Sequence, residues 1–204
     1  MELDPDRRTA PAEHGRRDVL SRRRGTVLED ALLQAAWQEL SAVGYARLTM
    51  EGAAARAGTS KAVLYRRWPN RAELVLAAVR NRMPTMASEI PDTGTLRGDV
   101  LTVLRQLRHR YREIGPDIVH GLMTERHELP ATVWQVVPEV MMTILRRAEE
   151  RGEVRLRKVT PRIAALPGDL IRHELLLAHA PVSDAVLAEI VDEVFLPLVT
   201  ARES

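Results

Sequence analysis

Apolar residues recur every three or four positions through most of the chain, which is the spacing of an amphipathic helix. The first such segment carries these residues on one face: Leu28, Leu32, Ala36 and Leu40. Thr26 and Glu29 have the spacing of a capping box, so this helix is predicted to begin at Thr26. It is predicted to end at Gly44, because glycine tolerates the left-handed conformation that commonly follows a helix.

Three more helices are predicted before residue 84. The second helix is predicted to be capped by Thr49 and to end near Ala57. The third is predicted to be capped by Ser60 and to end at Trp68. The fourth is predicted to be capped by Asn70 together with Glu73. The second and third helices are short and are joined by a tight turn at Gly58. This is the spacing of a helix-turn-helix, in which the second helix of the pair enters the major groove of DNA.

Prolines and glycines between residues 84 and 98 interrupt the periodicity and predict a boundary. Beyond it, helical spacing returns in residues 96–115, 117–127, 130–151 with a kink at Pro138, 160–179 with a bend at Pro167, and 183–195. No segment has the alternating pattern of a strand. We therefore expect an all-α protein in three parts: a disordered basic arm (1–25), a helix-turn-helix domain with a three-helix core (26–83) and a second helical domain (84–204).

The composition narrows the class of protein. The chain has no cysteine, which excludes disulfides and cysteine-ligated zinc. No apolar run approaches the ~18 residues that span a bilayer, so no membrane association is expected. Residues 1–25 mix acids and arginines, unlike a signal peptide, and the cytoplasm is the expected compartment.

The net charge of +2 is unevenly distributed. Residues 14–83 carry 13 Arg and Lys against 6 Asp and Glu, a surplus of +7, whereas residues 84–204 carry 15 against 18. This asymmetry predicts that only the N-terminal third meets a polyanion. The arm contributes Arg16, Arg17, Arg22, Arg23 and Arg24, which are expected to add electrostatic affinity; a solvated tail is the alternative.

The predicted third helix has two distinct faces. Leu64 and Trp68, four residues apart, are expected to face the core. The outward residues are expected to be Lys61, Ala62, Val63 and Tyr65, with Arg66 and Arg67 beside the phosphates. Lys61 can donate to guanine, while small or branched side chains suit close approach to a thymine methyl group. Ordinary helical hairpins share this spacing, so the pattern alone leaves that alternative open.

Residues 44–50 read GYARLTM and residues 57–74 read AGTSKAVLYRRWPNRAEL. Together they resemble the signature of the tetracycline-repressor (TetR) family of transcriptional regulators. The resemblance implies that Thr49 and Met50 lie where the second helix meets the DNA backbone, and that Tyr65, Arg67 and Arg71 contact phosphates. The alternative for Tyr65 is a partly buried ring that supports the helix. Departures from the family pattern at positions 63 and 67 mean that the operator sequence does not carry over.

The resemblance extends more loosely to the second domain, where it implies a regulatory domain that forms a homodimer through the last two helices. The final segment carries a wide apolar stripe: Val186, Leu187, Ile190, Val191, Val194, Phe195 and Leu198. Such a stripe fits burial against the same chain and a second subunit at once, with Phe195 in the interface. A final helix fully buried within the monomer is the alternative.

The resemblance also implies a small-molecule effector pocket among the middle helices. The candidate ligand-binding residues there are Tyr111, His120, Met123, Trp134, Met141 and His173. This mixture suits a mostly apolar pocket with a few polar groups, although each residue could instead be ordinary core. No metal site is expected, because His173 and His179 lack the spacing of a zinc-binding helix, and no cofactor is expected because no phosphate-binding loop is present.

These patterns predict a TetR-like DNA-binding regulator and not an enzyme. We expect it to repress transcription by binding a palindromic double-stranded DNA operator as a homodimer, and to be released by a small-molecule effector. Two alternatives stay open. One is an enzyme built on a helical bundle, for which no acid, base or metal constellation is visible; the other is a helical interaction protein without specific DNA binding.

Overall fold

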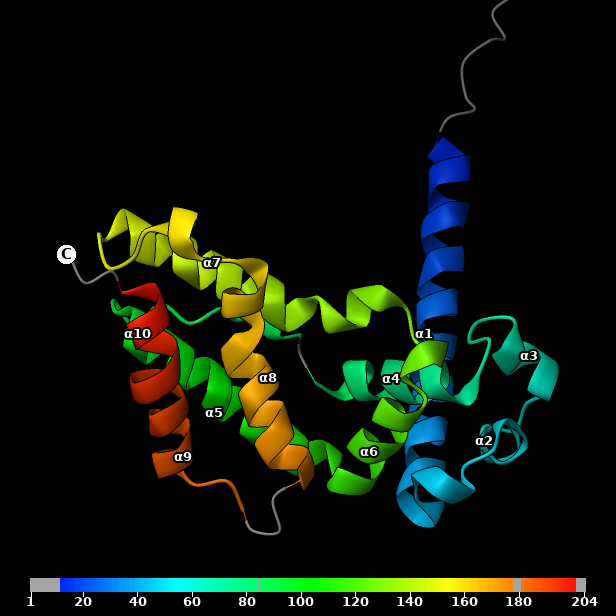
Figure 1. The fold of residues 1–204 in the computed structure, drawn as a ribbon. Coiled ribbons are helices and arrows are strands. Elements are labelled where there is room, and N and C mark those ends of the chain that lie inside the picture. Colours follow the sequence, from blue (N-terminus) through cyan, green and yellow to red (C-terminus); the bar gives the residue numbers. More distant parts are fainter. Residues whose placement is uncertain (1–11, 84, 178–180, 201–204) are drawn as a thin grey trace, which may run out of the picture. The chain divides into compact units, whose positions relative to one another are not determined.

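A computed structural model of the chain describes residues 12–83, 85–177 and 181–200, with side chains from residue 25 onward (Figure 1). Every regular element within these residues is a helix, which confirms the all-α prediction. The chain divides into two compact units. The first holds Arg47–Asn81 and the helix that ends at Val43; the second holds Gly44–Ala46 and the chain from Arg82 onward.

Helix α1 spans Ala12–Val43 and corrects the predicted start. Thr26 lies inside this helix rather than at its N-cap, and residues 12–25, which were expected to be disordered, belong to the helix. The reason is composition: Ala, Glu, Arg and Leu favour helix in this stretch, and no proline follows Pro11. Residues 1–11 and the arginine side chains of the arm lie outside the described part. Gly44, with φ of 76°, ends the helix as predicted.

The remaining helices of the first unit are α2 (Met50–Arg56), α3 (Lys61–Tyr65) and α4 (Arg71–Arg82). The predicted caps of α2 and α4 are confirmed: Thr49 Oγ1 accepts from the Gly52 amide at 3.0 Å, and Asn70 Oδ1 accepts from the Glu73 amide at 2.8 Å. The core combines apolar residues from all four helices and from the turn after α3: Leu32, Leu33, Ala36, Met50, Ala53, Ala54, Leu64, Trp68, Leu74 and Ala78. Tertiary packing therefore holds helices too short to be stable alone.

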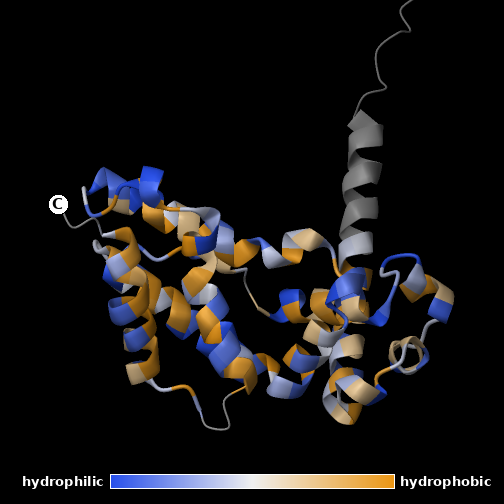
Figure 2. Cartoon of the chain, in the orientation of Figure 1, coloured by the Kyte–Doolittle hydropathy of each residue, from blue (hydrophilic) through white to orange (hydrophobic). Residues whose placement is uncertain are grey.

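The second unit consists of α5 (Leu96–Ile114), α6 (Pro116–Thr124), α7 (Val136–Glu150), α8 (Pro161–Leu177), α9 (Asp184–Glu189), a π-helix (Ile190–Phe195) and α10 (Leu196–Val199). Short 3₁₀ turns at Met86–Ser88, Arg126–Glu128, Ala131–Trp134 and Leu156–Lys158 join them, and another, Tyr45–Arg47, follows α1. Helix α9, the π-helix and α10 follow one another without a break and form the final rod, Asp184–Val199. Hydrophobic and hydrophilic positions are interspersed along α5, α7 and the final rod (Figure 2), as expected for helices with one buried face.

Two predicted features of this unit need correction, and a third is not tested. Pro138 does not kink a helix that begins at Pro130; a 3₁₀ turn comes first, and Pro138 lies in the first turn of α7, where a missing amide hydrogen costs little. The final segment is not one regular α-helix, because a π-helix separates α9 from α10. The predicted end of α8 near residue 179 lies outside the described residues.

A buried carboxylate ties the start of α5 to the end of α7. Asp99 is fully buried and accepts from the Thr93 amide at 2.6 Å, from Thr93 Oγ1 at 2.8 Å and from Arg151 Nη2 at 3.3 Å. A buried charge with several donors is stable, whereas the same charge without them is costly. Asp99 therefore serves the fold of the second unit.

Candidate nucleic-acid interface and ligand cavity

The turn between α2 and α3 is built by backbone hydrogen bonds around one glycine. Gly58 has φ of 61°, a conformation that side chains rarely adopt. Its amide donates to the Ala55 carbonyl at 3.1 Å, and the Thr59 amide donates to the Ala54 carbonyl at 3.0 Å. These two bonds form the Schellman motif that ends α2 sharply. The chain then enters α3 at Ser60, which occupies the N-cap position without a side-chain hydrogen bond.

Helix α3 has the two faces predicted from the sequence, although it is shorter than predicted and ends at Tyr65. Leu64 is fully buried and Trp68 is 7% exposed, and both belong to the core of the first unit. The outward residues are Lys61, Ala62, Tyr65 and Arg66, which are exposed, and Val63 and Arg67, which are partly buried. Two buried anchors thus hold a five-residue helix so that its basic face meets solvent.

Lys61, the first residue of this exposed face, takes part in an ion pair. Lys61 Nζ pairs with the Glu51 carboxylate of α2 and lies 5.3 Å from the centre of the Tyr65 ring. The side-chain hydrogen bond between them lowers the pKa of Glu51 and raises the pKa of Lys61. Lys61 is therefore a fully charged donor, and a DNA base would compete with Glu51 for it.

The other residues predicted to contact DNA differ in their exposure and in their hydrogen-bond partners. Met50 is only 4% exposed and lies in the core, so its side chain does not face outward as a contact would require. Thr49 is exposed and caps α2. Arg71 Nη1 donates to the Leu48 carbonyl at 3.3 Å, which joins the start of α4 to the segment before α2. Arg67 Nη1 is buried without a hydrogen-bond partner among the described residues.

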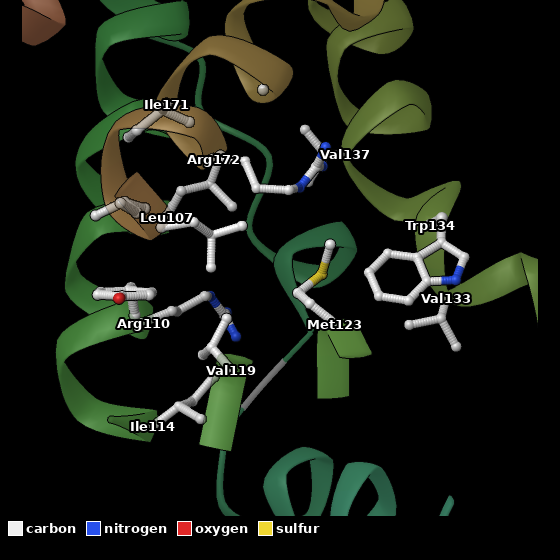
Figure 3. A pocket seen from close by; sticks show the side chains of 14 residues that line it. Leu107, Arg110, Ile114, Val119, Met123, Val133, Trp134, Val137, Ile171 and Arg172 are labelled. Carbon is white, nitrogen blue, oxygen red and sulfur yellow. The ribbon is translucent and has the colours of Figure 1, made fainter. Parts of the chain in front are cut away.

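The second unit contains a cavity of about 280 Å³ among α5, α6, α7 and α8 (Figure 3). Three of the six predicted ligand-binding residues line it: Tyr111, Met123 and Trp134. Most of the remaining lining is aliphatic and includes Leu107, Val119, Val137 and Ile171. Burial raises the pKa of Tyr111, so its hydroxyl stays protonated and can donate a hydrogen bond.

The other three predicted ligand-binding residues lie elsewhere. His120 borders a neighbouring hollow that shares Tyr111 with the cavity, and its ring centroid lies 6.5 Å from that of Tyr111. Met141 is fully buried in the hydrophobic core, and His173 is exposed. Residue type alone misplaced these two, because it does not indicate which side of a helix faces the cavity.

Sequence reasoning also missed two arginines that line the cavity, Arg110 and Arg172. A signal was present for the first. Leu107, Tyr111 and Ile114 form an apolar stripe with the spacing of one helix face, and Arg110 interrupts it.

The last helices also differ from prediction. Phe195 is fully buried in the core of its own chain, together with Leu187, Ile190 and Val191. Phe195 is therefore not an interface residue, and burial within the monomer explains most of the wide stripe. The exposed large hydrophobic residues on α8 and the final rod are Leu177 at 63%, Val194 at 37% and Leu198 at 49%.

In the part of the chain that the structure describes, no three His, Cys, Asp or Glu side chains are grouped so that they could hold a metal ion. Within the same residues, no helix combines the length and the apolar character that crossing a bilayer requires.

A tight helix-turn-helix that presents a basic second helix defines the class of helix-turn-helix DNA-binding regulators. Residues 32–78 match the family described as "Bacterial regulatory proteins, tetR family", and residues 90–194 match "Tetracyclin repressor-like, C-terminal domain". The chain belongs to the TetR family of transcriptional regulators, which are not enzymes.

Individual relatives agree with this assignment. The chain is 35% identical over 182 residues to an uncharacterised HTH-type transcriptional regulator of Mycobacterium bovis, covering 84% of this chain and 88% of the relative. It is 32% identical over 183 residues to a DNA-binding transcriptional repressor TetR of Mycobacteroides abscessus, covering 86% and 96%. A crystal structure of a TetR family transcription regulator matches with a TM-score of 0.60 and 26% identity over 82% of this chain and 96% of that chain. A Mesorhizobium loti structure, at 16% identity and a TM-score of 0.53 over 87% and 99%, shares the fold.

Proposed function

We propose that this regulator represses transcription by binding a palindromic operator as a homodimer, and that a small molecule in the cavity of the second unit releases it. The observation that carries the proposal is the joint presence, in one chain, of an outward basic helix in a helix-turn-helix and of a mostly apolar cavity of about 280 Å³ in the second unit. The name of the Mycobacteroides abscessus relative, a repressor, supports the direction of regulation. The expected compartment is the cytoplasm, where chromosomal DNA is found in bacteria.

On the operator, we assign base reading to Lys61, Ala62 and Val63, which begin α3. We assign phosphate contacts to the side chains of Thr49, Tyr65, Arg66, Arg67 and Arg71. Arg67 has a particular reason to move: its unpartnered, buried Nη1 carries a desolvation cost that a phosphate oxygen would relieve. Met50 keeps only a backbone role, because amides in the first turn of a helix have no partner within the helix.

The homodimer would use the exposed large apolar residues at the end of α8 and on the final rod, namely Leu177, Val194 and Leu198. A two-fold axis makes such a patch meet its own copy. The same axis would present two α3 helices to half-sites one helical turn of DNA apart, and so requires a palindromic operator.

Helix α6 offers a path from the cavity to the helix-turn-helix. Val119 and Met123 of this helix line the cavity. The Tyr45 amide donates to Asp117 Oδ2 at 2.9 Å, and the Tyr45 hydroxyl donates to Glu125 Oε2 at 3.0 Å. Because Tyr45 lies in the connection between α1 and α2, a ligand that shifts α6 would shift this connection too. Release then requires the ligand to prefer the shifted conformer.

The test is an operator selection from random duplex DNA with the full chain, followed by gel shifts at several salt concentrations. The expected product is a two-fold symmetric site bound by two chains, with affinity that falls as salt rises. Lys61→Ala should lose about 1–3 kcal/mol of specific affinity, while Arg146→Ala, an exposed change in the second unit, should lose none. Recovery of asymmetric sites, or equal affinity of both variants, would contradict the proposal.

A further inference from the structure

All charged residues that line the cavity carry the same, positive, charge. The lining consists of uncharged residues and two arginines, Arg110 and Arg172, and it contains no acidic side chain. A cavity lined in this way attracts anions and repels cations, because the apolar surroundings screen charge poorly. The charge of the ligand is therefore constrained more tightly than its shape.

The two arginines differ in what they already bind. Arg172 Nη1 pairs with Asp169 Oδ1 at 2.7 Å, one turn away on α8. Arg110 has no hydrogen bond or ion pair among the described residues, although it also borders a polar hollow that contains Glu89 and Glu113. Figure 3 shows its side chain crossing from α5 toward Val119, among apolar neighbours. The Arg110 guanidinium is partly buried and lacks a hydrogen-bond acceptor within the described part of the chain. A ligand with an acceptor group would supply the missing hydrogen bonds.

The opposite side of the cavity is suited to an apolar body. Trp134 points into it, and Met123 lies between Trp134 and the arginine (Figure 3). An adjoining hollow of about 90 Å³ shares Met123 and Trp134 and extends the space toward Pro138. The main cavity, at about 280 Å³, lies just below the ~300–1,000 Å³ that is usual for ligand pockets. A compact ring system or a short chain fits this size.

We propose that the effector is a small anionic amphiphile, a carboxylate on an apolar ring or short chain, whose carboxylate is received by Arg110 and whose body packs on Trp134 and Met123. This rests on the proposed function, in that the same cavity serves as the effector site. Arg110 is the residue that determines specificity for charge. The planar guanidinium can donate to both oxygens of a ligand carboxylate at once. A ligand amide has only one oxygen and no charge, so it cannot form the same pair of bonds.

The test uses isosteric pairs that differ only in charge: phenylacetate and phenylacetamide, 1-naphthaleneacetate and 1-naphthaleneacetamide, octanoate and octanamide. Binding to the free full-length protein is measured by calorimetry at neutral pH. For at least one pair, the carboxylate should bind about tenfold or more tightly than its amide, as a hydrogen bond to a charged group implies. The amine 2-(1-naphthyl)ethylamine should bind more weakly than the neutral amide.

Two variants of the arginine and one control sharpen this test. Arg110→Met keeps the apolar stem of the side chain. It should leave the affinity for the amide unchanged and lower the affinity for the carboxylate until the two are about equal. Arg110→Lys should retain part of the preference, and it also guards against a folding defect in the first variant. Arg146→Met, on the exposed side of α7, should keep the full preference.

Each outcome decides one claim. Equal binding of acid and amide, an undiminished preference in Arg110→Met, or no binding of any pair at millimolar concentration would overturn the anionic ligand class. Gel shifts on the selected operator then test the effector role separately. If a carboxylate binds through Arg110 but leaves operator affinity unchanged, the ligand class stands and release by this cavity fails. If amides release the DNA as well as acids do, release stands and the ligand class fails.

Discussion

Gly121 of α6 is packed so closely that a single added methyl group should disturb the connection between α1 and α2. A Cβ placed on Gly121 would lie 2.1 Å from Tyr45 Cδ1 and 2.4 Å from Tyr45 Cγ. The Tyr45 ring is only 3% exposed and has no flexible end that could give way. Gly121→Ala must therefore displace the whole ring, together with its hydrogen bond to Glu125.

The magnitude follows from three effects on the free energy of unfolding. Overpacking of a well-filled site costs about 1–3 kcal/mol. Loss of the Tyr45 hydrogen bond to a carboxylate costs about 1.5–3 kcal/mol. Alanine in place of glycine inside a helix returns about 1 kcal/mol. We expect Gly121→Ala to lower the free energy of unfolding by about 1.5–5 kcal/mol, the sum of these effects.

Urea unfolding of the full chain measures this change, and the chain supplies its own control. Gly25 lies within α1 and has no atom within 4 Å of a Cβ placed on it. Gly25→Ala should therefore gain up to about 1 kcal/mol from helix propensity alone. In a Tyr45→Ala background the clash is absent, so Gly121→Ala should then behave like the control. A Gly121→Ala protein as stable as the parent chain would refute the reasoning, because no steric conflict would remain to explain.

Other perturbations test separate parts of the molecule. Glu51→Gln should modestly strengthen operator binding, because it frees Lys61 from an exposed ion pair of little intrinsic strength; a weaker gel shift would mean instead that Glu51 orients the lysine. Leu198→Asp should turn dimers into folded monomers in sedimentation, whereas Phe195→Ala should lower the free energy of unfolding by about 3–5 kcal/mol, and the reverse pattern would contradict the assignment of exposed and buried faces. Asp99→Ala should cost about 3 kcal/mol in urea unfolding, because its buried donors lose their acceptor, and a cost below 1 kcal/mol would show that water replaces it.

Features that depend on a few neighbouring residues were predictable from the sequence. Thr49 and Asn70 cap their helices through bonds to amides three residues later, and Gly44 and Gly58 take the left-handed conformation that ends a helix. Leu64 is buried at the spacing that predicted it. Such signals act within one turn of helix, so that the rest of the fold hardly changes them.

Features that depend on what packs against a helix were not predictable in the same way. Met50 begins α2 at a position where the family resemblance implies DNA, yet its side chain enters the core. Phe195 shares an apolar stripe with Val194 and Leu198, and the pattern does not indicate which of these a helix keeps for its own chain. The start of α1 was misjudged for a related reason: a charged segment rich in good helix formers can extend a helix without an apolar face to reveal it.

The ligand cavity illustrates how sequence could have come closer. The choice of Met141 and His173 rested on residue type, and both lie away from the cavity. The face of α5 that carries Leu107, Tyr111 and Ile114 was visible in the spacing, and all three residues line the cavity. On that face Arg110 is the exception, since a guanidinium among aliphatic neighbours loses hydration that only a partner can restore. A charged residue that interrupts an apolar helix face thus indicates a ligand better than the aromatic or sulfur-containing residues around it, because these are equally at home in a core.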